Sequence, residues 1–178
     1  LIFLIFNFNF SAIENLSLIS IFFLGFLSDI KKINSPKVRF FIQFFIIIFY
    51  LFYSSNFISE TKIFFIDNLL SNNFFEILFT LICIAIVING SNFIDGLNTL
   101  CIGYYLNILI ILYLLSNSNI IQFDQSLNII IFFVICFFFN LIGKSFLGDN
   151  GSYLLGFLFS IFLIKISNQT NSLSPWFI

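Results

Sequence analysis

Six long apolar runs, separated by short polar segments, limit the folds that are open to this chain. Backbone amides and carbonyls inside a bilayer have no water to bind, so runs of this length without alternation fold there as helices. We therefore predict an all-α, polytopic membrane protein with about six transmembrane helices. The predicted spans are Ile13–Leu27, Val38–Ser54, Phe74–Ile88, Leu97–Leu115, Leu127–Ile142 and Tyr153–Ile166. Several are shorter than the roughly 20 residues of a full crossing, so we expect their ends to extend into the flanking Asn- and Ser-containing segments.

Composition supports a membrane location and excludes several classes of function. Of 178 residues, 60% are hydrophobic and 31 are Phe, and the mean hydropathy is +1.11, which a soluble domain of this size could not bury. The net charge of −1, with no basic stripe, argues against nucleic-acid binding. There is no His, which removes His metal ligands, His general bases and Ser–His–Asp triads. The three cysteines lie singly in apolar runs and are expected to be small buried side chains.

The ends of the sequence suggest that it is part of a longer protein. There is no Met, the first residues are the apolar stretch Leu1–Phe10, and an apolar run starts again at Pro175–Ile178. We interpret residues 1–178 as one membrane-embedded domain and as an internal fragment.

Three of the polar segments each carry one aspartate: Asp29, Asp95 and Asp149. Spans in series alternate sides of the membrane, so all three segments fall on one face. Most of the basic residues belong to that face, namely Lys31, Lys32, Lys37, Arg39 and Lys144, whereas Lys62 and Lys165 lie nearer the other. The positive-inside rule then makes the aspartate face cytoplasmic. Carboxylates at a membrane edge are costly and usually functional, so we predict one shared site.

The third polar segment has the most specific chemistry. Asp149 follows Gly148 and precedes Asn150, Gly151 and Ser152, directly before an apolar helix. Free amides at a helix start suit a phosphate, with Gly151 and Ser152 as contacts. Asp149 can hold Mg²⁺, which prefers carboxylate and phosphate oxygens, and Lys144 can meet a phosphate. The alternative is a loop in which Asp149 and Ser152 only cap the helix.

The other two segments are more ambiguous. The second offers Asn89, Asn92, Asp95 and Asn98, whose amides could read a uracil edge or a sugar hydroxyl; the alternative is an N-cap with turn chemistry. In the first, Asp29 is followed by basic residues that serve either as topology anchors or as attraction for an anionic headgroup.

Taken in order, the motifs resemble those of the polyprenyl-phosphate sugar-1-phosphate transferases. The family pattern is GFxDD, an R-x-x-x-Q helix, NxxNFxDGxDGL and KxFxGDxGS. Here the segments read GFLSD, RFFIQ, NGSNFIDGLN and KSFLGDNGSYLLGF, in the same order and across nearly the whole chain. The last two lean toward the O-antigen type rather than the phospho-N-acetylmuramoyl-pentapeptide type.

The resemblance implies a set of site residues. It makes Asp29, Asp95 and Asp149 catalytic, with Asp149 and Asp29 as metal ligands for Mg²⁺, or alternatively Mn²⁺. It also implies a substrate-binding set of Asn89, Asn92, Asn98, Asn140, Lys144, Gly151 and Ser152.

The resemblance also implies the reaction and its setting. A sugar-1-phosphate passes from a UDP-sugar, by default an N-acetylhexosamine, to polyprenyl phosphate, which initiates cell-envelope polysaccharide synthesis. The expected location is the bacterial inner membrane, with the site facing the cytoplasm and a homodimer as one option.

Two positions depart from the family pattern. Ser28 replaces the first aspartate of the usual pair, and Asn98 replaces the second aspartate of DGxD. The family's later His-containing loop is expected beyond residue 178. These departures keep a non-catalytic relative open as an alternative. A transporter and an intramembrane aspartyl protease are less favoured, because the carboxylates collect at one face among basic residues and Asn.

Overall fold

The computed structural model describes residues 8, 10–96, 99–117 and 126–169, and these residues form helices with no strand among them. The predicted all-α class is therefore confirmed. The helices are α2 (Ala12–Asp29), α3 (Pro36–Ser54), α4 (Phe64–Leu70), α5 (Asn73–Ile94), α6 (Leu100–Asn117), α7 (Ser126–Leu141) and α8 (Gly148–Gln169). Each predicted span corresponds to one of them. The short helix α4 lies in a segment that we expected to be only a connection.

Four helices are long and apolar enough to cross a membrane: α2, α3, α5 and α8. The apolar parts of α6 and α7 are shorter, at Leu100–Ser116 and Leu127–Leu141. The molecule is thus a polytopic membrane protein by its helices, while the predicted count of six spans is not confirmed.

Two helices extend further into polar sequence than predicted. α5 continues through Asn89 and Asn92 to Ile94, and α8 begins at Gly148, so these polar residues lie in helical turns rather than loops. Two polar side chains in this stretch of α5 bond within the helix itself. Asn89 Nδ2 donates to the Ala85 carbonyl at 2.7 Å and Ser91 Oγ to the Val87 carbonyl at 2.7 Å. A span predicted from hydropathy ends at such polar residues, although the helix itself continues past them.

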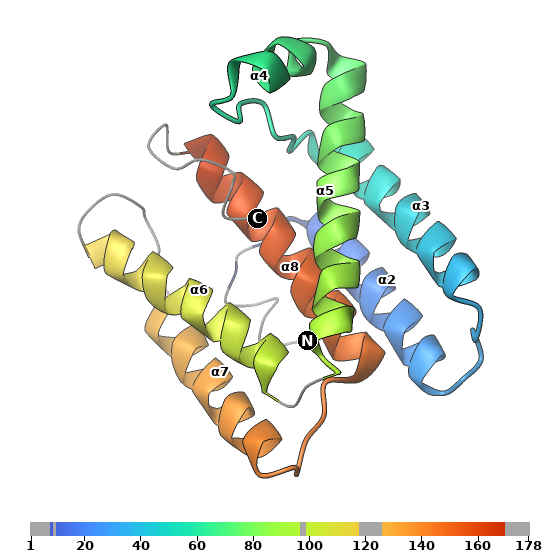
Figure 1. Ribbon diagram of the computed structural model, residues 1–178, viewed down its shortest axis with the longest axis vertical. Coiled ribbons are helices and arrows are strands. Elements are labelled where there is room, and N and C mark those ends of the chain that lie inside the picture. The colour runs from blue at the N-terminus through green and yellow to red at the C-terminus, as the bar shows by residue number, and fades with distance from the viewer. Residues whose placement is uncertain (1–7, 9, 97–98, 118–125, 170–178) are drawn as a thin grey trace.

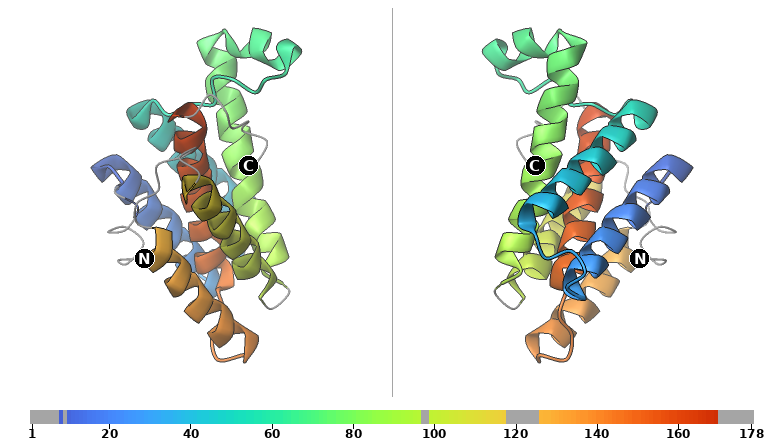
Figure 2. Two further views of the ribbon diagram at one scale, coloured as in Figure 1. Left: turned by 90° about the vertical axis from the view of Figure 1, so that its left-hand side faces the viewer. Right: turned by 90° about the vertical axis from the view of Figure 1, so that its right-hand side faces the viewer.

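Helix α8 forms the centre of the bundle (Figure 1). Within its apolar window 72% of residues are buried, against 39% or less in the other three long helices. α2 and α5 make the most extensive contacts with α8, and α6 pairs with α7. The side views show α2 and α3 next to each other (Figure 2). Buried side chains such as Leu18, Ile84 and Phe157 fill the space between these helices.

The outer surface is also apolar. On α3, Phe41, Phe45 and Phe52 are 60% exposed or more. Such a surface would be unfavourable in water and suits lipid.

Gly25 permits a very close approach of α2 to α8. A Cβ atom at this position would lie only 2.3 Å from Cα of Asn150. The absence of a side chain therefore brings the last turn of α2 against the first turn of α8, which is where Asp29 and Asp149 are located.

At the opposite end of the same two helices lies a buried ion pair. Nζ of Lys165 on α8 is 2.6 Å from Oε2 of Glu14 on α2, and the Glu14 side chain is only 1% exposed. Glu14 also completes a capping box with Ser11 and accepts from Asn56 Nδ2 at 3.2 Å. These bonds satisfy the carboxylate inside the fold.

Chain order brings six helix ends together. The C-terminal ends of α2, α5 and α7 and the N-terminal ends of α3, α6 and α8 lie at the lower end of the bundle in Figure 1. All three aspartate segments therefore meet there.

Candidate functional site

Asp29 caps the start of α8 across the helix interface. Its Oδ1 accepts from the backbone N–H of Asp149 at 2.8 Å, and its Oδ2 accepts from that of Asn150 at 3.1 Å. Gly148 has a φ of +64°, and a Cβ there would lie 2.8 Å from Asp29 Oδ2, so the turn requires glycine. A carboxylate at a helix N-terminus is stabilised by the amides and by the helix dipole.

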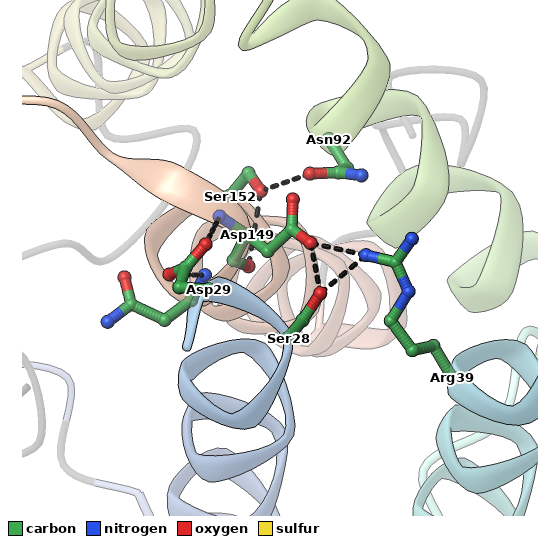
Figure 3. Close-up of polar contacts among 7 residues, drawn as sticks. Ser28, Asp29, Arg39, Asn92, Asp149 and Ser152 are labelled. Atoms are coloured by element: carbon green, nitrogen blue, oxygen red, sulfur yellow. Dashed lines mark hydrogen bonds and ion pairs between the residues drawn. The ribbon is translucent and has the colours of Figure 1, made fainter. Parts of the chain in front are cut away.

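Asp149 is held by two side chains from other helices. Its Oδ2 accepts a hydrogen bond from Ser28 Oγ and forms an ion pair with Arg39 Nη1 (Figure 3). Arg39 Nη1 also donates to Ser28 Oγ. The Arg39 and Asp149 side chains are 19% and 26% exposed, so this ion pair is largely shielded from water.

Asp95 is the third carboxylate at this end of the bundle. It is the C-cap residue of α5, just outside the membrane-spanning segment. Burial raises the pKa of Asp95 to about 6, and the negative charges of Asp149 and Asp29 add to this rise, while a hydrogen bond from the Gly148 backbone opposes it. Asp95 is therefore close enough to Asp149 and Asp29 to be repelled by both.

Amide and hydroxyl groups of the predicted site connect its helices. Ser152 Oγ donates to Asn92 Oδ1 at 3.0 Å, which joins α8 to α5 (Figure 3). Asn89 Nδ2 donates to Gln43 Oε1 on α3 at 3.0 Å. Hydrogen bonds to neighbouring helices thus fix the side chains of Asn89, Asn92 and Ser152.

Asn140, at the end of α7, links two connections. Its Oδ1 accepts from the Thr99 backbone N–H at 2.6 Å, and its Nδ2 donates to the Ser145 carbonyl at 2.8 Å. Lys144 is exposed in the α7–α8 connection. Asn98 lies outside the described residues.

The helix start that we expected to offer free amides is already bonded. Asp29 takes the N–H groups of Asp149 and Asn150, and the Leu147 carbonyl accepts from the Gly151 N–H at 3.1 Å. These three amides are therefore not free in this structure, and the assignment of Gly151 and Ser152 as substrate contacts stays a prediction.

Three residues of the site were not in the predicted set: Ser28, Arg39 and Gln43. The signal for the last two was their spacing of four, which places both on one face of α3 beside the first aspartate segment. Ser28 was noted only as a departure from a family pattern. Its hydroxyl in fact touches both Asp149 and Arg39.

The donor set is compatible with a hard divalent cation that shares its shell with a ligand. The described residues contain no group of three His, Cys, Asp or Glu side chains arranged to hold a metal alone. Mg²⁺ usually takes one or two carboxylates and completes its shell with phosphate oxygens and water. Asp149 fits that role, since its Oδ1 takes part in neither the Ser28 nor the Arg39 contact. Asp29 retains further lone pairs beyond its two amide bonds.

One comparison with known proteins identifies the family of this chain. The family model described as glycosyl transferase family 4 matches residues 12–167, a range that includes all the described site residues from Ser28 to Ser152. No curated protein and no solved structure matched the chain. The match indicates a membrane transferase that moves a sugar phosphate to a polyprenyl phosphate. The chain therefore belongs to glycosyl transferase family 4.

Proposed function

We propose that the chain transfers a sugar-1-phosphate from a UDP-sugar, an N-acetylhexosamine derivative, to polyprenyl phosphate. The products are polyprenyl-diphospho-sugar and UMP, and the lipid product starts a cell-envelope polysaccharide such as an O-antigen. The observation that carries this proposal is the meeting of Asp29, Asp95 and Asp149 at one end of the bundle.

The reaction needs positioning and charge neutralisation more than a proton acceptor. An oxygen of the acceptor phosphate attacks the phosphorus that bears the sugar, a new P–O bond forms, and the P–O bond to UMP breaks as UMP leaves with the electron pair. The acceptor is a phosphate monoester with a second pKa near 6, so it is mostly dianionic at neutral pH. Ser28 in place of an aspartate therefore removes no required base.

Asp149, together with Asp29, is the proposed holder of Mg²⁺, with Mn²⁺ as the alternative. When bound, such an ion neutralises charge on the diphosphate oxygens. Asp29 also fixes the first turn of α8, so its carboxylate sets where Asp149 stands. A substitution of Asp29 then affects both metal binding and helix position.

The remaining side chains are proposed to orient the substrates. Asp95, Asn89 and Asn92 lie on or directly after the last turns of α5 and face the nucleotide or sugar. From the α7 and α8 side come the further proposed contacts Asn140, Lys144, Gly151 and Ser152. Asn98 completes the set proposed from sequence.

An apolar groove beside the site suits the polyprenyl tail. It has a volume of about 720 Å³ and runs between α5 and α6, with Phe137 of α7 on one side. Ile94 and Thr99, which flank the turn that holds Asp95, line it together with Val87 and Tyr104. A tail in this groove would place its phosphate near the aspartates.

The proposed setting is the bacterial inner membrane with the aspartates at the cytoplasmic face. The basic residues Lys31, Lys32 and Lys37 near this end support that orientation. A homodimer remains part of the proposal.

The decisive experiment is a transfer assay on membranes that contain the full protein. Labelled UDP-N-acetylhexosamines are supplied with polyprenyl phosphate, with and without Mg²⁺, and Asp149→Asn serves as the matched control. We expect lipid-linked label and released UMP only with Mg²⁺ and intact Asp149. Absence of transfer with every sugar nucleotide would favour a non-catalytic relative. Full Mg²⁺-dependent turnover by Asp29→Asn would refute the role given to Asp29.

A further inference from the structure

Arg39 and Ser28 occupy the same oxygen of Asp149. Oδ2 accepts from both groups, which fills the two lone pairs of that atom. A carboxylate oxygen in this state has no lone pair left for a metal ion. A divalent cation at Asp149 must either use Oδ1 alone or displace Arg39.

Charge makes the same point. Asp29, Asp95 and Asp149 lie close together. Among the described residues, Arg39 forms an ion pair with one of these three aspartates, Asp149. A guanidinium at this position supplies part of the positive charge that a divalent cation would otherwise bring. A divalent cation that takes both oxygens of Asp149 therefore competes with Arg39 for Oδ2.

Arg39 is also incompletely bonded where it stands. Its Nε is buried and has no hydrogen-bond acceptor among the described residues. A buried donor without a partner is unfavourable. An acceptor such as a phosphate oxygen would satisfy Nε, and guanidinium groups bind phosphate through two parallel N–H groups.

We propose that Arg39 and Ser28 are positioning residues that hold Oδ2 of Asp149 when no divalent cation is bound, and that a cation bound through both carboxylate oxygens moves Arg39 from Asp149 to a substrate phosphate. The inference rests on the proposed metal role of Asp149. Ser28 is essential to it, because a hydroxyl can donate to Asp149 and accept from Arg39 at the same time. An unprotonated aspartate at position 28 has no proton to donate and would instead compete for Arg39.

The test measures direct binding of Mn²⁺ to the full chain in lipid nanodiscs without substrate. The electron paramagnetic resonance signal of free Mn²⁺ reports how much of the ion is bound. Arg39→Gln is expected to bind Mn²⁺ about tenfold more tightly than the wild type, because a competing charge is gone. Ser28→Ala keeps every charge and is expected to bind about threefold more tightly, because one hydrogen bond to Oδ2 is lost.

Lys37→Gln is the matched control. Lys37 is exposed in the first turn of α3, so its removal lowers the charge of the same face without freeing Asp149. We expect its Mn²⁺ affinity to stay within about twofold of the wild type, since exposed charges are screened. Asp149→Asn added to Arg39→Gln should abolish the gain. Thermal unfolding of each variant verifies that it is folded.

The competition is refuted if folded Arg39→Gln and Ser28→Ala bind Mn²⁺ no more tightly than the wild type. It is also refuted if Lys37→Gln gains as much as Arg39→Gln, or if no variant binds Mn²⁺ at all. Sugar-phosphate transfer is measured separately, so tighter Mn²⁺ binding without any transfer would overturn the proposed function while leaving this inference in place.

Discussion

Replacing Gly25 by alanine tests whether the approach of α2 to α8 builds the site. The new Cβ would lie 2.3 Å from Cα of Asn150, 2.6 Å from its N and 2.7 Å from the Asp149 carbonyl oxygen. All three are backbone atoms, so no side chain can turn aside. Carbon atoms in contact prefer about 3.5–4.0 Å, and the two helices must therefore separate by more than about 1 Å at this point.

That separation has two consequences of known size. Overpacking of a tight contact costs about 1–3 kcal/mol. The bonds from Asp29 to the amides of Asp149 and Asn150, now 2.8 and 3.1 Å, would lengthen beyond hydrogen-bonding range. Because Asp29 is exposed, we add only about 1 kcal/mol for them. Gly25→Ala should thus lose about 3 kcal/mol of stability, and a shift of about 1 Å at Asp149 should lower turnover roughly 100-fold.

Thermal unfolding in nanodiscs and the transfer assay measure the two effects. Gly90→Ala is the control for stability, since a Cβ there meets nothing within 4 Å. We expect the apparent unfolding midpoint of Gly25→Ala to fall by about 6–12 °C, and that of Gly90→Ala not to fall. A Gly25→Ala protein with the wild-type midpoint and turnover would show that the helices are not held together as described.

Three further predictions concern single contacts. The pKa of Asp95 is raised to about 6 from its usual 3.8, so the folded state holds this proton more tightly than the unfolded state does. Without metal, the free energy of unfolding should therefore decline as pH rises between these two pKa values. Asp95→Asn should lack that decline in unfolding scans, and a decline that persists would mean that the carboxylate is not buried as described. Glu14→Gln leaves Lys165 without its ion-pair partner and should cost about 2 kcal/mol of stability. The double variant Glu14→Leu/Lys165→Leu should recover most of this loss in the same unfolding scans. No recovery would mean that packing rather than charge is responsible. Asn140→Ala removes both bonds between the two connections and should cost about 1–3 kcal/mol and speed hydrogen exchange at Thr99, and unchanged exchange would contradict the link.

Much of the fold could be predicted from the sequence because a membrane leaves few alternatives. Each apolar run became a helix, and alternation of the spans brought Asp29, Asp95 and Asp149 to one end. Helix boundaries could not be predicted from hydropathy, because Asn89 and Ser91 bond within α5 and let it continue into polar sequence.

The connections inside the site were harder to predict. The motif around Asp149 suggested free amides, yet a carboxylate from a helix 120 residues earlier in the chain occupies two of them. Likewise, nothing local in the sequence shows that Ser28 would bridge Asp149 and Arg39. Such contacts depend on how α2, α3 and α8 pack, which a single sequence does not encode in its local pattern.

The two contacts between α2 and α8 at their opposite ends have a mechanical consequence. Asp29 holds the first turn of α8, and Glu14 binds Lys165 close to its last turn. Because the two helices are joined at both ends, we expect them to move together. Arg39 and Asp95 belong to other helices, α3 and the end of α5. We therefore expect the motions of a catalytic cycle in α3 and α5, which carry charges toward and away from a stationary Asp149.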